Sequence, residues 1–398
     1  MKFETYKISE LIDEISMGPF GSNIKVECFV DSGIPVLNGS NLEGHSLKED
    51  SFRYVTEEKA DSLGKANAHR GDVVITHRGT LGQIVFIPQD SKYDRYVISQ
   101  SQFRVRCNEK ILPEYLVYYF HTRIGQHKLL ANASQVGVPA LARASTTFQT
   151  IEIDIPSIVD QEKIVNLLEL LRKKTELNTA INNNLEQEMQ ALYKSWFINF
   201  DPFGGQKPSS WTTSDIYSIA NIIYGAPFAS KMFNTEGNGK PIIRIRDLKD
   251  QEFVTYTTEI HPKGYLLKPA DIVVGMDGEF RPYIWGNEEA WLNQRVCVFE
   301  NKRPNGKAFL LYSIKPLLHR IEQTQVATTV IHIGKKDFDA FEITLPDADI
   351  LDKFDEITEP MIYQIVSNRM ENKRLAALRN TLLPQLMSGA LDLSNVDI

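Results

Sequence analysis

Cysteine is scarce in this chain of 398 residues: it has three, Cys28, Cys107 and Cys297, and no CxxC pair. Such isolated cysteines argue against a disulfide framework and against a thiolate zinc site, and they fit a reducing cytoplasm. No uncharged apolar run approaches the roughly 18 residues of a membrane-spanning helix. The first residues, MKFETYKISELIDEIS, lack the apolar segment of a signal peptide.

The usual catalytic signatures are also missing. No GxxxxGK[ST] loop is present, which excludes a P-loop ATPase, and the histidines show no HExxH or other metal-ligand spacing. Asp201-Pro202-Phe203 resembles the Asp-Pro-Pro-Tyr motif of amino-methyltransferases, but it lacks the second proline and no FxGxG-type loop precedes it. Matches to the Asp…Glu-x-Lys pattern of nucleases, such as Glu371-Asn372-Lys373, are short enough to arise by chance. The sequence therefore predicts no catalytic site and no metal site.

The composition that remains is that of an ordinary globular protein, with 42% hydrophobic and 24% charged residues. The length predicts two or three domains, each able to bury a core. The 44 basic and 51 acidic residues give a formal net charge of −7. Charge alone would argue against a nucleic-acid binder, because phosphates attract basic surfaces.

Two copies of one pattern follow each other along the chain, and a repeat of this kind largely determines the fold. Each copy starts with a Pro-Phe pair and ends with an alternating strand before a proline. The matched segments, in order, are 18–22 with 225–230, 33–36 with 239–242, 72–74 with 271–274, 98–100 with 292–294, and 148–156 with 338–346. Any single match is weak, but five in the same order indicate a tandem duplication.

The first part of each copy reads as mixed β-structure with loops. Residues 71–76 and 84–88 are short apolar runs on either side of a Gly79-Thr80-Leu81-Gly82 turn, which is typical of paired strands. Alternating isoleucines over 151–155 predict a half-buried strand. Residues 116–130 and 309–321 are predicted to be helical.

Each copy then changes to a long helical pattern, over 160–197 and over 350–383. Its apolar residues recur every three or four positions, which is typical of a coiled-coil seam. A helix of about 35 residues is roughly 50 Å long and cannot bury such a stripe alone, so we expect the two helices to pack on each other. The predicted seam consists of Leu171, Ile181, Leu185, Met189, Leu192, Phe354, Ile357, Met361, Ile365, Leu375, Leu378 and Leu382.

Asparagines interrupt both apolar stripes at comparable places, Asn182-Asn183-Asn184 in the first and Asn368 with Asn372 in the second. A polar residue in a seam costs stability but fixes register. A helix end or a kink is the alternative interpretation. Residues 201–205 are expected to end the first helix, and Pro384 with Gly389 to end the second.

Basic and aromatic residues gather at matching places in the two β-rich parts, and residues 92–106 and 240–249 each carry a net charge of +3. Arginine with glutamine or asparagine can read guanine and adenine edges, whereas lysine mainly meets phosphate. A solvated charged face is the alternative interpretation. The candidate DNA-binding residues are Ser22, Lys25, Arg78, Thr80, Lys92, Tyr93, Arg95, Gln100, Gln102, Arg104, Arg106, Lys231, Arg244, Arg246, Arg281, Tyr283, Trp285, Asn293 and Gln294.

This organisation resembles the specificity (S) subunit of type I restriction–modification enzymes over essentially the whole chain. The resemblance rests on residues 18–22, 71–75 with 79–82, 156–164, 192–202 and 386–389. The second copy departs from the pattern: Gly278-Glu279-Phe280-Arg281 replaces the Gly79–Gly82 turn, and Leu351 stands near where Gln161 leads the first helix. Such divergence fits domains that read different bases.

The resemblance implies a non-catalytic DNA-recognition subunit of α+β fold. Target-recognition domains are expected over 1–156 and 204–346, a spacer helix and linker over 157–203, and a spacer helix and tail over 347–398. The two helices would form an antiparallel coiled coil. Each domain would read one half of an asymmetric, bipartite site in double-stranded DNA. The candidates to stack on distorted bases are Phe20, Tyr93, Tyr283 and Trp285, although packing in the protein is the simpler interpretation for each.

The resemblance also implies partners. Two modification subunits would carry S-adenosylmethionine and methylate adenine, and restriction or motor subunits would carry ATP and magnesium, while this chain would bind no cofactor. We expect the complex in a prokaryotic cytoplasm, associated with the nucleoid through DNA.

Two hypotheses from other classes stay open: a single-chain nuclease or methyltransferase with an unrecognised site, and a coiled-coil interaction protein without a DNA role. The charge distribution does not argue against DNA, because the helical segments 157–203 and 347–398 carry −6 of the net −7. The two candidate recognition domains sum to −1. We therefore expect the isolated chain to bind DNA weakly and to rely on partner subunits for phosphate attraction.

Overall fold

The structure is a computed structural model that describes residues 1–134, 137–278, 280–324, 332–393 and 396. The chain divides into two compact units, Met1–Arg172 with Ala376–Ile398, and Lys173–Leu375. Both long helices cross this division, so each unit contains one β-rich part and a portion of each helix. The domain limits at 156, 203 and 346 instead follow the order of the chain, and they stay a prediction.

The first unit is built on two four-stranded sheets. In the central sheet all neighbouring strands are antiparallel, in the order β2 (Ile12–Met17), β9 (Gln102–Cys107), β6 (Asp72–Thr76) and β7 (Ile84–Phe86). The order in the second sheet is β4 (Arg53–Val55), β3 (Ile34–Val36), β8 (Arg95–Val97) and β5 (Asn67–His69). Both faces of β6 are covered: Val73 and Ile75 enter one core and Val74 another, all 0% exposed. This explains its continuous apolar run.

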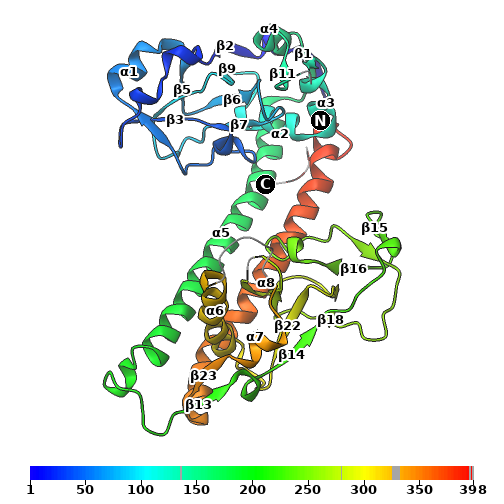
Figure 1. Cartoon of the computed structure of the whole chain (residues 1–398). Coiled ribbons are helices and arrows are strands. Elements are labelled where there is room, and N and C mark those ends of the chain that lie inside the picture. Colours follow the sequence, from blue (N-terminus) through cyan, green and yellow to red (C-terminus); the bar gives the residue numbers. More distant parts are fainter. Residues whose placement is uncertain (135–136, 279, 325–331, 394–395, 397–398) are drawn as a thin grey trace. The chain divides into compact units, whose positions relative to one another are not determined.

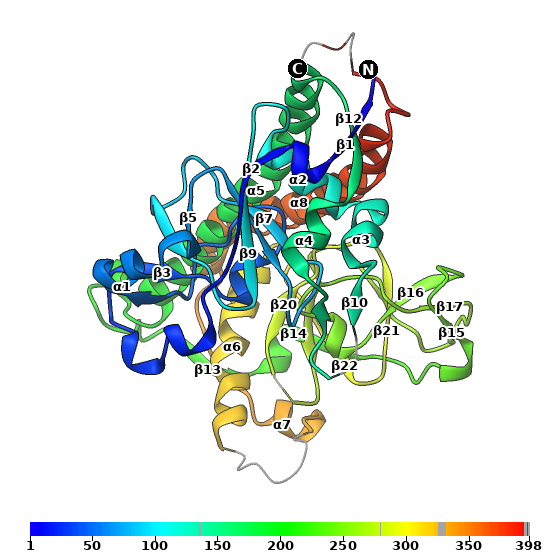
Figure 2. The ribbon, with the colours of Figure 1, turned by 90° about the horizontal axis from the view of Figure 1, so that it is seen from above.

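The helices α2 (Pro113–His121), α3 (Arg123–Leu130) and α4 (Ala144–Gln149) pack around the central sheet of the first unit. The helix α1 (Glu57–Ser62) packs on the second sheet, where Ala60 joins the core of β3, β4 and β8. Figure 2 shows α2, α3 and α4 gathered beside β9 and β7. The single helix predicted over 116–130 is in fact two, because Thr122 adopts extended backbone and its hydroxyl accepts from the Gly125 amide at 3.0 Å. Two short antiparallel pairs complete the unit: β1 (Glu4–Lys7) with β12 (Glu152–Ile155), and β10 (Ala133–Ser134) with β11 (Ala140–Leu141).

The second unit repeats this plan. Its central antiparallel sheet has the order β14 (Ala220–Tyr224), β22 (Val296–Asn301), β19 (Ile272–Gly275) and β20 (Pro282–Ile284). The other sheet has the order β15 (Phe233–Asn234), β17 (Tyr256–Thr257), β16 (Lys240–Ile243), β21 (Ala290–Leu292) and β18 (Leu266–Leu267). The helices α6 (Lys307–Thr324) and α7 (Lys335–Asp339) and the pair β13 (Thr212–Asp215) with β23 (Glu342–Leu345) complete it.

Several hydrogen bonds correspond between the two units, as expected for a tandem duplication. The Gly18 amide donates to the Gln102 carbonyl at 2.8 Å, and the Gly225 amide to that of Val296 at 3.0 Å. The His77 amide donates to the Ser101 carbonyl in the first unit, as the Met276 amide does to the Arg295 carbonyl in the second. The Asp72 carboxylate accepts from the His69 amide, as the Asp271 carboxylate does from the Lys268 amide. The alignment of the copies therefore holds at these positions.

The long helices are α5 (Ile158–Phe197) and α8 (Ala348–Met387), each of 40 residues, drawn green and orange to red in Figure 1. They pack antiparallel, because within the second unit Asn178 Nδ2 donates to Asn372 Oδ1 at 2.9 Å while Asn368 Nδ2 donates to Asn182 Oδ1 at 2.9 Å. Both helices continue through these asparagines without a break. The asparagines therefore join the helices, and the helix-end interpretation is wrong.

Most predicted seam residues face the partner helix or the adjoining core. Met189, Phe354 and Ile365 are fully buried, and the remainder are half-buried apart from two. Those two, Ile357 and Leu378, are 42% and 46% exposed, so their assignment to the seam is wrong. On α8 the buried stripe steps from Phe354 by four residues to Thr358, which leaves Ile357 outside it. Pro384 does not end α8 either, since the helix runs on to Met387 and stops before Gly389.

Candidate nucleic-acid interface

Four loops of the first unit meet at one end of its central sheet. Strands β2 and β6 end there, and β9 and β7 begin there. The loops are tied together by main-chain hydrogen bonds: His77 N to Ser101 O at 2.8 Å, Gly79 N to Pro139 O at 2.9 Å and Leu141 N to His77 O at 2.8 Å. We call residues 18–23, 77–83, 98–101 and 137–143 the first loop surface.

The first loop surface combines exposed polar, basic and apolar side chains. Arg78, Thr80, Gln100 and Arg143 are exposed, and none of the four segments contains an aspartate or glutamate. Phe20 is 83% exposed and Val138 57%. Burial lowers the pKa of His77, whose Nε2 lies 3.1 Å from the carbonyl oxygen of Gln100, so this ring is a neutral part of the surface. Such a surface suits a polyanion whose bases also offer hydrogen-bonding edges.

Two glycines fix the first of these loops against the third. A methyl group added at Gly18 would lie 1.9 Å from the carbonyl oxygen of Ser99, and one added at Gly21 would lie 2.2 Å from Oε1 of Gln100. The loop can therefore sit this close to the Ser99 backbone only with glycine at position 18, whereas the flexible Gln100 side chain could move away from a larger residue at position 21. The Pro-Phe pair between them is presented on a defined backbone.

The equivalent segments of the second unit form the second loop surface, residues 225–231, 276–278, 280–281, 293–295 and 332–334. Ile333 N donates to Met276 O at 2.9 Å, as Leu141 N does to His77 O. Lys231, Arg281 and Gln294 are exposed and Asn293 is half-buried. Here Asp277 replaces Arg78, and it pairs with His332 and, at 3.4 Å, with Nη1 of Arg295. Glu279, the changed turn position, lies outside the described residues.

Several candidates from the first copy are structural instead, because their side chains are buried. Arg104 is 4% exposed and contacts Glu14 at 3.1 Å and Asp72 at 3.3 Å. Arg106 joins the same cluster, with its Nε 3.1 Å from Asp72 Oδ1. Gln102 is 1% exposed, and its Oε1 accepts from the Ser99 amide at 2.8 Å. Base reading by Arg104 and Gln102 is therefore not retained.

Other candidates from the first copy lie away from its loop surface. Arg95, on β8, pairs with Asp61 at 2.6 Å. The Tyr93 hydroxyl, just before β8, lies 3.2 Å from that of Tyr54 on β4 of the same sheet. Lys92 lies over the Tyr93 ring, 5.6 Å from its centroid. Lys25 is exposed just beyond the first loop and pairs with Glu27 at 3.6 Å. The side chain of Ser22 lies outside the described part of the structure.

In the second copy the aromatic candidates lie on β20 or directly after it, and not in a turn. Trp285 is 0% exposed, and its backbone amide donates to Asp271 O just as that of Ile87 donates to Asp72 O. It is thus the counterpart of a core isoleucine, and stacking of Trp285 on DNA is not retained. Tyr283 lies on β20 and is half-buried. Arg244 is half-buried against Asp247 at 3.3 Å, whereas Arg246 is 69% exposed.

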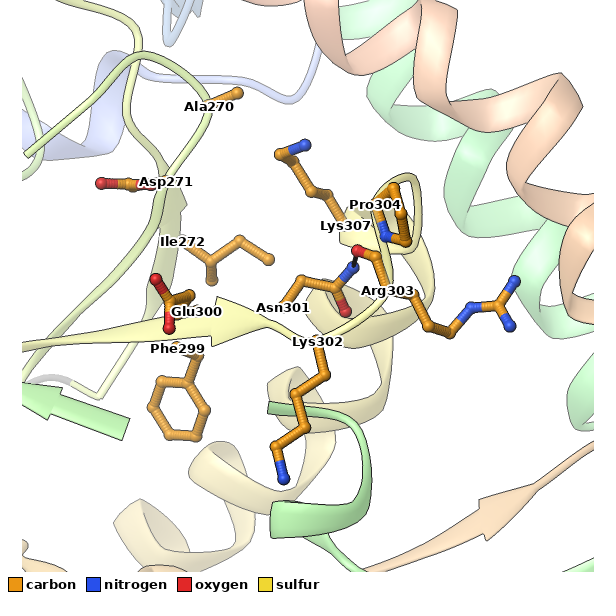
Figure 3. A pocket seen from close by; sticks show the side chains of 10 residues that line it. All are labelled: Ala270, Asp271, Ile272, Phe299, Glu300, Asn301, Lys302, Arg303, Pro304 and Lys307. Atoms are coloured by element: carbon orange, nitrogen blue, oxygen red, sulfur yellow. Dashed lines mark hydrogen bonds between the residues drawn. The ribbon is translucent and has the colours of Figure 1, made fainter. Parts of the chain in front are cut away.

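A separate cleft of about 240 Å³ lies at the opposite end of the second central sheet, where β22 ends and β19 begins. Figure 3 shows Asp271, Glu300 and Lys307 among the side chains that line it, and Arg303 directed toward α8, where it pairs with Asp352 and Asp355. Burial, reinforced by Glu300, raises the pKa of Asp271. The cleft belongs to the far side of the scaffold from the second loop surface. Within the described residues no cluster of three histidine, cysteine or acidic side chains could hold a metal.

Sequence reasoning missed two exposed members of the first loop surface, Arg143 and Val138. They come to it only through the pairing of β10 with β11, which returns residues 137–143 to the end of β6. No short motif marks them. The positive φ of Arg143 is a local feature that sequence could not supply.

A family model described as the type I restriction modification DNA specificity domain matches residues 2–187 and again residues 208–365. The chain belongs to this family. It is a specificity subunit, which recognises a DNA sequence and is not itself an enzyme. The assignment decides against the single-chain enzyme and the coiled-coil protein without a DNA role. Within the described residues no helix is long and apolar enough to cross a membrane.

Individual relatives agree with the family. The MjaIX specificity subunit of Methanocaldococcus jannaschii is 23% identical over 409 residues, which cover 96% of this chain and 91% of the relative. The EcoBI specificity subunit of Escherichia coli is 37% identical over 138 residues, so that match spans 34% of this chain and 29% of the relative's length. The S subunit structure from M. genitalium shares the fold, with a TM-score of 0.62 at 14% identity over 97% of this chain and 96% of that one.

Proposed function

We propose that the two loop surfaces each read one half of a bipartite, asymmetric site in double-stranded DNA. The observation that carries this proposal is that the same main-chain scaffold presents different side chains in the two copies. Arg78 in the first stands where Asp277 stands in the second, within an otherwise matching bonding pattern. Two readers that share a scaffold but differ in chemistry suit two different half-sequences.

The side chains proposed for contact are those that are exposed on these surfaces or on their flanks. In the first copy they are Arg78, Thr80 and Gln100, with Lys25 as a more distant phosphate contact. Arg106 lies beside Asp72 at the other end of β9 and is not included. In the second they are Lys231, Arg281, Asn293 and Gln294, and the exposed Arg246 is a further candidate outside the second loop surface. Arginine and glutamine would contact base edges, and lysine would fix the register on phosphate.

Helices α5 and α8 are proposed as the spacer between the half-sites. Each has 40 residues and so is about 60 Å long. The buried asparagine pairs Asn178–Asn372 and Asn182–Asn368 support a single register between them. A single register would give a single gap in the recognised sequence.

Partner subunits would supply the chemistry. We propose that two modification subunits, carrying S-adenosylmethionine, bind this chain and methylate adenine, and that restriction or motor subunits join with ATP and magnesium. We place the complex in the cytoplasm, on the nucleoid. The net charge of −7 supports a reader that relies on these partners for part of its phosphate attraction.

A domain exchange tests the proposal. Residues 1–156 would be replaced by those of another specificity subunit, and adenine methylation would be mapped across a genome. We expect one half of the methylated sequence to change while the other half and the gap stay the same. The reciprocal exchange of residues 204–346 is the matched control and should change the other half alone. A single exchange that altered both halves would contradict separate reading.

A further inference from the structure

The fold of the first unit does not explain why the Phe20 side chain is exposed on the first loop surface. The side chain is 83% exposed, although burial of a phenylalanine normally stabilises a protein. Its backbone is well defined: the Asn23 amide donates to the Phe20 carbonyl at 2.8 Å, and Gly18 and Gly21 seat the loop on Ser99 and Gln100. The ring is therefore presented to solvent from a fixed position.

The second copy shows that the same loop can bury its aromatic residue. Phe228 follows the matching glycine and proline and is 7% exposed. Its ring centroid lies 5.6 Å from that of Trp291 and 5.4 Å from that of His261. Strand pairing places Val97 of the first copy where Trp291 stands in the second, so Phe20 has no ring to cover it there. The exposure of Phe20 is a property of the first copy and not of the loop.

The surroundings of Phe20 identify the chemistry of what could cover it. The other exposed residues of the first loop surface include Arg78, Arg143 and Gln100, and its segments contain no acidic residue. Val138, which is 57% exposed, adds a second apolar group at the same surface. Apolar side chains flanked by arginine are the combination with which proteins enter DNA grooves and separate a base step. An apolar protein partner would instead call for a larger continuous patch.

We propose that the Phe20 ring inserts against a base step in the half-site read by the first domain and stabilises the duplex in a distorted form. This inference rests on the proposed function. Opening a base step costs stacking energy, and a ring that occupies the opened step recovers part of that energy by stacking on the neighbouring bases. Because Phe228 is buried, the second half-site receives no such ring.

The test uses the full chain assembled with its modification subunits, and duplexes that carry the site found by methylation mapping. A single 2-aminopurine is placed in turn at each position of both half-sites, and its fluorescence reports unstacking. In the wild-type complex we expect enhanced fluorescence at a step of the first half-site other than the target adenine. Phe20→Ala should remove that signal and weaken binding about 5- to 150-fold, the equivalent of about 1–3 kcal/mol.

Two control variants separate stacking from other effects. Phe20→Trp keeps a ring and should keep the signal, and Ile198→Ala removes an apolar side chain that is 57% exposed elsewhere and should change nothing. Because Phe20 packs against no core, Phe20→Ala should leave thermal unfolding unchanged. Selective binding by the wild type without any unstacked step beyond the target adenine would overturn the inference, as would a Phe20→Ala complex indistinguishable from Ile198→Ala. Loss of sequence selectivity in the wild-type complex itself would instead contradict the proposed function.

Discussion

Substitution of Arg104 tests whether the buried charge cluster of the first unit serves stability and not DNA reading. The guanidinium is 4% exposed and donates to Asp72 Oδ2 at 3.3 Å and, through Nε, to the Lys65 carbonyl at 2.9 Å. Asp72 is fully buried. Arg104→Ala would therefore leave a buried carboxylate with a single remaining cation, Arg106, at 3.1 Å.

Removing one partner of a buried ion pair costs about 3–5 kcal/mol. We expect a value near the lower end, about 3 kcal/mol, because Arg106 and the His69 amide still contact Asp72. For a unit of about 200 residues this corresponds to a fall in melting temperature of roughly 6–12 °C. Arg246→Ala is the matched control: its side chain is 69% exposed and 3.8 Å from Asp247, so the loss should stay below about 1 kcal/mol.

The positions of the tryptophans allow the two units to be followed separately. All four, Trp196, Trp211, Trp285 and Trp291, lie within Lys173–Leu375, so tryptophan fluorescence reports the second unit alone. Arg104→Ala should lower the transition seen by circular dichroism before it affects the fluorescence transition. At temperatures well below melting the variant should methylate the same sequence as the wild type. An unchanged melting curve together with a changed methylated sequence would refute the structural role and restore base reading.

Three further predictions concern the spacer and the buried acids. Insertion of seven residues in α5 near Asn182 and seven in α8 near Asn368 should lengthen the gap between half-sites by about 10 Å, or roughly three base pairs. An unchanged gap in the methylation map would contradict the spacer role. Asn182→Leu combined with Asn368→Leu should keep or raise stability but allow more than one gap length. Asn182→Leu alone should lower the unfolding free energy by about 1–3 kcal/mol, because the Asn368 amide loses its partner. Burial, opposed by Arg303, raises the pKa of Asp355 to about 6. The unfolding free energy of the second unit should therefore decrease as the pH rises from about 4 to about 6 and this carboxyl ionises. Asp355→Asn should flatten that part of the fluorescence-monitored stability profile, and a profile identical to the wild type would exclude Asp355 as its source.

The duplication and the two long helices could be predicted from the sequence because each leaves a regular trace. Matched turns recur in one order, and apolar residues recur every three or four positions over 40 residues. The phase of a helix is harder to predict where polar residues enter the stripe. Thr358 is buried while Ile357 is exposed, because the helix must also cover the second core and not only its partner helix.

The candidate site could be predicted only in part, because burial decides which arginines can meet DNA. Arg104 and Gln102 alternate with Phe103 and Val105 on a strand that is covered on both faces. The sequence does offer one signal for this: Asp72 opens an apolar strand, and a buried carboxylate there requires a cation from its neighbour. The cluster also affects Glu14, where burial acts to raise the pKa but the hydrogen bond and charge of Arg104 outweigh it and hold that pKa below its usual value.

Comparison of the two copies separates scaffold from recognition more sharply than either copy alone. The carboxylates of Asp72 and Asp271 cap the same backbone position, through His69 N and Lys268 N, so this contact belongs to the scaffold. Around it the copies diverge: Arg106 neutralises Asp72, whereas Glu300 lies near Asp271 and raises its pKa further. At the opposite end of the sheet the loops diverge again, with Arg78 against Asp277 and an exposed Phe20 against a buried Phe228. Since the main-chain hydrogen bonds are kept while the charge and the apolar exposure of the loops change, the folding requirement and the reading requirement fall on different residues of the same domain. We therefore expect that exchange of the loop side chains on retained strands would change the DNA sequence that a domain recognises.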